Sequence, residues 1–208
     1  MITPFVENTF CLTEDRQGRK TASFYIDPWL CRNVCARCAI REWKDQPYKL
    51  MDEDMFYREL ARYSLFKVGL INIRGGDISN KGLLRADGMP LEELLPVVRQ
   101  VAPVCIWTNG SNTDAVVSLL PYVDGFRIDI KVPLFGKVSR RSKTLWERAL
   151  GFNKGVDTYI KAVKNTINKV DGMAETYYTS SSWRDMDAAN RELMLDAMAE
   201  YESPFIVE

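Results

Sequence analysis

The sequence predicts an α/β fold, an open, partial (β/α)6 barrel with its helices outside a parallel sheet. Short apolar runs typical of buried strands alternate with longer stretches of helical periodicity, which favours parallel strands joined by helices. Six such strands follow the N-terminal segment in a chain of 208 residues, whereas a closed barrel of this kind needs eight. Polar motifs follow several of the runs, at the places where barrel enzymes carry their active sites.

The N-terminal segment, residues 1–20, is expected to form an edge hairpin outside the barrel. Short apolar runs at residues 5–7 and 10–12 could be strands, and residues 14–18 are turn-like. The barrel is expected to occupy residues 21–208, so that residues 1–208 form one domain.

Each predicted barrel strand is a short apolar run that ends at turn residues. The first run stops at Asp27-Pro28, and the third stops at Asn109-Gly110. Glycine, proline and asparagine interrupt a strand and begin a turn. In chain order, the strands are predicted at residues 22–26, 68–73, 104–108, 126–132, 174–179 and 204–207.

The helices between these strands are predicted from spacing and from their first residues. Met51, Met55 and Leu60 recur at helical spacing, so they indicate one apolar face. Pro90 stands at the start of the next helix, where proline is favoured, and Asp185 is a suitable N-cap for the last one. The helices are predicted at residues 51–64, 90–101, 113–120, 142–150, 156–170 and 185–201.

Composition limits the class of protein. Hydrophobic residues make up 46% of the chain, as in ordinary globular proteins. The 28 Lys and Arg residues balance the 28 Asp and Glu residues, so we expect no binding of nucleic acid or of an anionic membrane. No apolar run is long enough to span a membrane and no signal peptide opens the chain, which predicts a cytoplasmic location. The absence of histidine excludes a Ser-His-Asp triad and a histidine-ligated zinc site.

Three cysteines, Cys31, Cys35 and Cys38, lie close together in a C-x3-C-x2-C stretch after the first predicted strand. Three thiolates on one loop can converge on a single metal centre. Structural zinc takes four Cys or His ligands, and the other cysteines, Cys11 and Cys105, lie far away in the sequence. Iron–sulfur clusters are held by thiolates alone, and three thiolates leave one iron of a four-iron cluster open to another ligand. Clustered cysteines in odd number favour a metal centre over disulfides.

The cysteine stretch resembles the signature of the radical S-adenosylmethionine (SAM) superfamily. The resemblance implies a [4Fe-4S] cluster on Cys31, Cys35 and Cys38, with the amino and carboxylate groups of SAM on the fourth iron. It also implies that the open barrel is of the radical SAM type. The alternatives are a zinc-bound loop and a purely structural iron–sulfur loop.

Two motifs at strand ends resemble SAM-binding segments of this superfamily. Gly75-Gly76-Asp77 is similar to the GGE motif, which contacts the SAM amino group, although its acid is one methylene shorter. Thr108 begins a segment similar to the TNG segment of glycyl-radical-enzyme activating enzymes. Trp107 stands where those enzymes carry an acid for a monovalent cation. A tight turn at Gly75-Gly76 is the structural alternative.

Asp129 and Lys131 end the fourth predicted strand, within a segment that closely resembles the VDG-x-x-x-D-x-K strand of pyruvate formate-lyase activating enzymes. Residues two apart on a strand point to the same face. The resemblance implies that Lys131 binds a carboxylate and that Asp129 binds a ribose hydroxyl or a cation. The alternative is an inward ion pair. Where the family carries an arginine for the SAM carboxylate the sequence has Thr176, which leaves Lys131 or Arg74 for that contact.

The resemblance implies an enzyme of the activase type, similar to the activating enzymes of pyruvate formate-lyase and anaerobic ribonucleotide reductase. Reductive cleavage of SAM would give a 5′-deoxyadenosyl radical that abstracts hydrogen from a glycine of a partner glycyl-radical enzyme. A flavodoxin or ferredoxin would supply the electron, and no catalytic residue beyond the cluster and SAM is implied. The alternatives are a small-molecule substrate, as in 7-carboxy-7-deazaguanine synthases, and a non-catalytic iron–sulfur module.

Overall fold

The structure is a computed structural model that describes residues 1–7, 10–28, 31, 47–78, 88–150, 155–180 and 182–207. Its centre is a nine-stranded sheet with the strand order β4-β1-β3-β5-β6-β7-β8-β9, and β2 pairs with β3. The run from β3 to β9 is parallel throughout. The parallel strands are β3 (Lys20–Ile26), β5 (Leu70–Gly75), β6 (Val104–Thr108), β7 (Gly125–Ile130), β8 (Tyr177–Ser180) and β9 (Phe205–Ile206).

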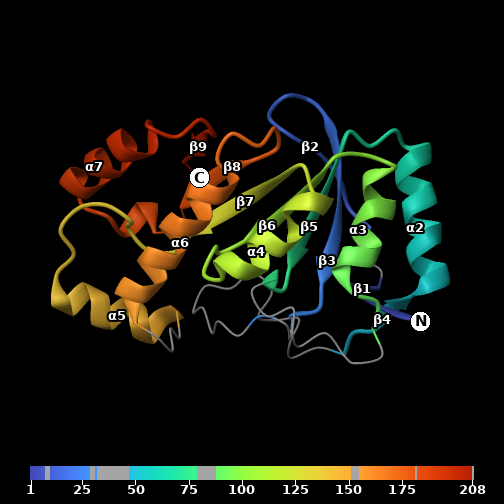
Figure 1. Ribbon diagram of the computed structural model, residues 1–208, viewed down its shortest axis with the longest axis horizontal. Helices are drawn as coiled ribbons and strands as arrows, with labels where there is room; N and C mark the ends of the chain where they lie inside the picture. Colours follow the sequence, from blue (N-terminus) through green and yellow to red (C-terminus); the bar gives the residue numbers. More distant parts are fainter. Residues whose placement is uncertain are drawn as a thin grey trace.

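Helices connect the parallel strands, and α3, α4 and α6 lie over one face of the sheet (Figure 1). None of the helices in the described part of the chain is long and apolar enough to cross a membrane. The helices are α2 (Glu53–Leu65), α3 (Leu91–Arg99), α4 (Thr113–Leu119), α5 (Arg140–Leu150), α6 (Val156–Val170) and α7 (Ala188–Met198), with short 3-10 turns at η3 (Leu120–Tyr122) and η4 (Trp183–Asp185).

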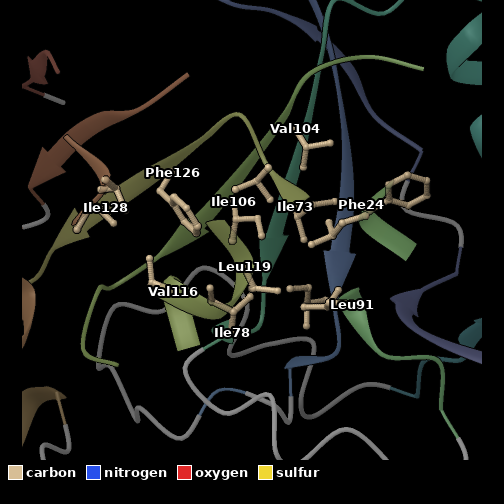
Figure 2. Close-up of a cluster of buried hydrophobic side chains, with 14 of the residues drawn as sticks. Phe24, Ile73, Ile78, Leu91, Val104, Ile106, Val116, Leu119, Phe126 and Ile128 are labelled. Carbon is tan, nitrogen blue, oxygen red and sulfur yellow. The ribbon is translucent and has the colours of Figure 1, made fainter. Parts of the chain in front are cut away.

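The main apolar core lies between the sheet and these helices (Figure 2). Alternate strand residues such as Ile73, Ile106 and Phe126 are fully buried there, beside Leu91 of α3 and Leu119 of α4. Burial of such side chains is the main favourable contribution to folding. Because side chains alternate along a strand, the residues between these apolar ones point to the opposite face, called here the inner face.

The predicted barrel agrees with the structure in type and in element order. Six parallel strands form a sheet that ends at β9 and does not close, as predicted for a partial barrel. The predicted helix at residues 156–170 coincides with α6, and the others differ from the structure by a few residues at their ends. Apolar periodicity is therefore sufficient to locate these elements.

The predicted N-terminal hairpin is wrong. The strand at residues 5–7 corresponds to β1 (Ile2–Val6), which pairs with β3 and with β4 (Leu50–Asp52) and not with its neighbour in sequence. The hairpin is instead formed by β2 (Leu12–Glu14) and β3, joined by a turn in which the Asp15 carboxylate accepts from the backbone N–H groups of Gln17 and Arg19. The turn lies at the turn-like residues 14–18, as predicted, but the strand that follows it is the first strand of the barrel.

Asp171, directly after α6, is hydrogen-bonded to the segment that precedes β9. Its carboxylate accepts from the backbone N–H groups of Glu202 and Ser203, each at 2.9 Å, and from the Tyr178 hydroxyl at 2.8 Å. Partial burial opposes ionisation, but these hydrogen bonds outweigh it and lower the pKa of Asp171. The ionised carboxylate of Asp171 therefore stabilises the edge of the sheet at which β9 pairs with β8.

We expect Asp171→Asn to lower the free energy of unfolding at pH 7 by about 1–2 kcal/mol, because two backbone donors lose a charged acceptor. A lowered folded-state pKa gives stability that is full above the unfolded value of about 4 and is lost as the pH falls through the folded value. Urea unfolding at pH 7 and pH 3 should show a smaller pH dependence in the variant. Asp196→Asn, on the exposed side of α7, is the control. An unchanged pH dependence in Asp171→Asn would contradict this role.

Candidate functional site

The residues predicted to contact a cluster or SAM follow the strands at one edge of the sheet. Cys31 comes shortly after β3, and its backbone N–H donates to the Pro28 carbonyl at 3.2 Å. Gly75 ends β5, Thr108 ends β6 and Asp129 is the second-last residue of β7. The carboxyl ends of parallel strands meet at one edge, which is the usual place of active sites in such folds.

The metal ligands are only partly within the described residues. The Cys31 side chain is partly exposed, while Cys35 and Cys38 lie outside the described residues. Within the described ranges, no three Cys, Asp or Glu side chains come together in a group that could hold a metal ion. The predicted metal centre therefore depends on a stretch of which the structure describes only the first cysteine.

The two glycines at the end of β5, Gly75 and Gly76, bring this strand end against the chain that leads to Cys31. Gly75 has a φ of +107°, which an L side chain rarely adopts. A Cβ atom on Gly76 would lie 2.2 Å from the carbonyl oxygen of Asp27. The Gly76 N–H also donates to the Ile26 carbonyl at 3.1 Å. In the described part of the chain, the glycines therefore allow a close approach between two backbone segments.

Asp77 joins the ends of β5 and β6. Its carboxylate accepts from the Thr108 hydroxyl at 3.1 Å and from the Asn109 backbone N–H at 2.8 Å. Both Asp77 and Thr108 are buried. These two predicted SAM contacts are thus brought together and hydrogen-bonded to each other, and the carboxylate has further acceptor capacity for a ligand amine.

Asp129 and Lys131 form an ion pair on the inner face of β7, in keeping with their spacing. The side chains are partly exposed, so the pair can exchange partners with a ligand. Tyr159 of α6, which the sequence analysis missed, accepts from the Lys131 backbone N–H and donates to the Asn109 carbonyl, both at 3.1 Å. It joins the ends of β6 and β7.

Two residues that the sequence analysis considered for this site pack within the fold. Thr176 stands where the family carries an arginine, and its hydroxyl accepts from the Phe126 backbone N–H at 2.9 Å. Cys105 is fully buried, and burial raises the pKa of its thiol to about 12. A fully buried thiol held in the protonated form is typical of a packing residue.

A continuous row of side chains crosses the inner face close to this edge. On β5 and β6 it lies one residue before the end of the strand. Tyr25 pairs in register with Arg74, Trp107 with Arg127, and Arg127 with Tyr177. The Arg74 guanidinium lies over Tyr25 at 4.5 Å and over Trp107 at 4.9 Å, and the Arg127 guanidinium lies over Trp107 at 3.9 Å and over Tyr177 at 5.6 Å. These five residues, called here the inner row, alternate aromatic and cationic side chains across five strands.

The inner row was only partly visible in the sequence. Trp107 and Arg74 could be identified from the sequence because they stand beside predicted motifs. Arg127, Tyr25 and Tyr177 were not identified as site residues. One available signal was the alternation along β7, which places Arg127 on the same face as Asp129. The cross-strand contacts need the register of the whole sheet.

No family model matches the sequence, and no curated protein is similar to it. Among solved structures, TYW1 with a lysine-pyruvate adduct bound has 16% identity and a TM-score of 0.43 over 76% of this chain and 54% of the TYW1 chain. HydG, a maturase of the [FeFe]-hydrogenase, has 12% identity and a TM-score of 0.56 over 86% of this chain and 40% of the HydG chain. This chain thus spans about two-fifths of HydG, and the likeness shows that the two chains share a fold over that part.

Proposed function

We propose that this protein is a radical SAM enzyme, in which Cys31, Cys35 and Cys38 hold a [4Fe-4S] cluster and the adjacent strand ends bind SAM. One observation carries the proposal: Cys31 follows β3 at the same edge of the sheet where Asp77, Thr108 and Asp129 follow or end the next strands. The C-x3-C-x2-C spacing and the fold shared with HydG support it.

The residues at this edge fit such a group by their chemistry. A chain without histidine offers thiolates as its soft metal ligands, and thiolates are the ligands of iron–sulfur clusters. Asp77 has acceptor capacity for the amino group of SAM, Lys131 has a positive charge for its carboxylate, and Asp129 can accept from a ribose hydroxyl. When bound, the cluster and SAM would supply a 5′-deoxyadenosyl radical.

The hydrogen bonds from Thr108 and Asn109 to the Asp77 carboxylate fix the ends of β5 and β6 relative to each other. The carboxylate oxygens of Asp77 are therefore held in place before a ligand binds. Tyr159 does the same for the ends of β6 and β7. We infer that the role of these residues is to position SAM, while the radical chemistry belongs to the cofactor.

We further propose that the hydrogen donor is a glycine on a loop of a partner glycyl-radical enzyme, and that a flavodoxin or ferredoxin supplies the electron. The segment around Asp129 and Lys131, which resembles activating enzymes, supports this target, and an open sheet edge suits a protein loop. The second candidate is a small molecule, which the charged and aromatic inner row favours.

The test is an anaerobic assay on protein reconstituted with iron and sulfide, reduced with dithionite and supplied with SAM. We expect 5′-deoxyadenosine from the wild type and none above background from Cys38→Ala, which should also lose most of its bound iron. Cys11→Ala, outside the cysteine stretch, is the matched control and should keep both. A fully loaded cluster without SAM cleavage, in the presence and absence of a glycyl-radical partner, would contradict the proposal.

A further inference from the structure

Arg74 has a guanidinium donor without an acceptor. Its Nε atom is buried and has no hydrogen-bond partner among the described residues, while its Nη2 atom donates to the Tyr25 hydroxyl. No ion pair within the described ranges involves Arg74. A buried donor that lacks a partner destabilises a protein, and the effect is larger for a charged group. Arg74 is therefore poised to bind an acceptor that the described part of the chain does not provide.

The neighbours of Arg74 hold its guanidinium in place. Trp107 is fixed by a hydrogen bond of 3.1 Å from its Nε1 atom to the Asn72 side-chain oxygen, and it lies under the Arg74 and Arg127 guanidinium groups. Arg127 in turn donates to the Thr179 hydroxyl at 3.4 Å. The two cations thus share one aromatic ring that cannot neutralise them.

The acidic groups close to this row are already engaged. Asp129, two residues beyond Arg127 on the same face, pairs with Lys131, and Asp77 accepts from Thr108 and Asn109. Glu175 is held in a bidentate ion pair with Arg19, with distances of 2.7 and 2.8 Å. The charge of Arg74 is therefore not balanced by these three carboxylates.

We propose that the inner row is the anion subsite of the substrate, and that Arg74 binds a carboxylate group of the molecule from which hydrogen is abstracted. The proposal rests on the proposed radical SAM function. A guanidinium presents parallel N–H groups that match a carboxylate, and aromatic stacking occupies only the faces of the guanidinium plane. The row lies one residue before Gly75 on β5 and before Thr108 on β6, so it is separate from the strand ends assigned to SAM.

Such a carboxylate could belong to a small acid or to an acidic side chain on a partner's loop. Two pairs of probes distinguish these sources. The first pair is benzoate and benzamide, which have the same planar shape and differ in charge. The second pair is a glycine-containing hexapeptide with one aspartate and its asparagine counterpart.

The experiment measures binding of the four probes to the reconstituted protein by calorimetry, with saturating SAM. We expect the charged member of one pair to bind about tenfold or more tightly than its neutral partner. Arg74→Gln should remove this preference, Arg74→Lys should keep part of it because the charge stays and the planar fork is lost, and the exposed Arg58→Gln should not change it. The pair that shows the preference identifies the source of the carboxylate.

Equal binding of charged and neutral probes in the wild type would overturn the proposal. It would also be overturned if Arg74→Gln weakened SAM binding and left the probe preference intact, because Arg74 would then hold the carboxylate of SAM. Thermal unfolding of each variant shows whether the fold is kept. A probe preference without any 5′-deoxyadenosine formation would contradict the proposed radical SAM function but not the anion subsite, since probe binding needs no turnover.

Discussion

Gly76→Ala is expected to destabilise the protein by about 3 kcal/mol or more, because the added methyl group meets rigid backbone. The new Cβ would lie 2.2 Å from the Asp27 oxygen and 3.1 Å from its carbonyl carbon. Neither atom can move as a side chain does, so the segment between Ile26 and Cys31 must shift as a whole. Urea unfolding of the purified variant measures the loss.

Gly18→Ala is the matched control for this prediction. Gly18 also has a positive φ, of +72°, but an added Cβ there meets nothing within 4 Å. We therefore expect a loss of about 1–2 kcal/mol, which reflects the backbone conformation alone. Bound iron per chain provides a second measurement, and Gly76→Ala should lower it while Gly18→Ala leaves it unchanged. Equal stability of Gly76→Ala and the wild type would show that these two segments are not in backbone contact.

The second large effect is expected from Asp77→Ala, with a loss of about 2–4 kcal/mol in the free energy of unfolding. The substitution leaves the Thr108 hydroxyl and the Asn109 N–H buried without their acceptor, and each such donor costs about 1–3 kcal/mol. Asp77→Asn keeps one carbonyl acceptor and should lose about half as much. Chemical unfolding at pH 7 compares the three proteins.

A double-mutant cycle with Thr108→Val tests whether the two side chains act together. If their hydrogen bond is the cause, the combined variant should be less destabilised than the sum of the single variants by about 0.5–3 kcal/mol. Asp196→Ala on the surface of α7 should have little effect. Strict additivity would mean that Asp77 contributes to stability independently of Thr108, through the Asn109 N–H group.

Local patterns predicted most of the fold. The helix over residues 156–170 and the strand over residues 104–108 coincide with α6 and β6, because their apolar periodicity is strong and their ends carry turn residues. The N-terminal strands were paired wrongly because the partner of β1 is chosen by the sheet and not by nearness in sequence. β1 joins β4, about 45 residues further along the chain, which no local pattern indicates.

The site was predictable in position but not in its contacts. Motifs at strand ends place Asp77, Thr108 and Asp129 at one edge, because the ends of parallel strands meet there. The hydrogen bond between Asp77 and Thr108 connects residues 31 positions apart, and the stacking of Arg127 on Trp107 depends on the register of β6 against β7. Such contacts follow from three-dimensional packing, which spacing along one strand does not contain.

The register of the inner row restricts how this protein can evolve. Phe126, Ile128 and Ile130 face the helices, while Arg127 and Asp129 alternate with them on the other face. Deleting one residue inside β7 would exchange the two sets and push ionic groups into the apolar core. A lineage can therefore change the specificity of this surface by point substitution, whereas insertions and deletions within its strands are eliminated by selection. Changes in chain length are expected to accumulate in the connections between strands, and the spacing within each strand is expected to persist.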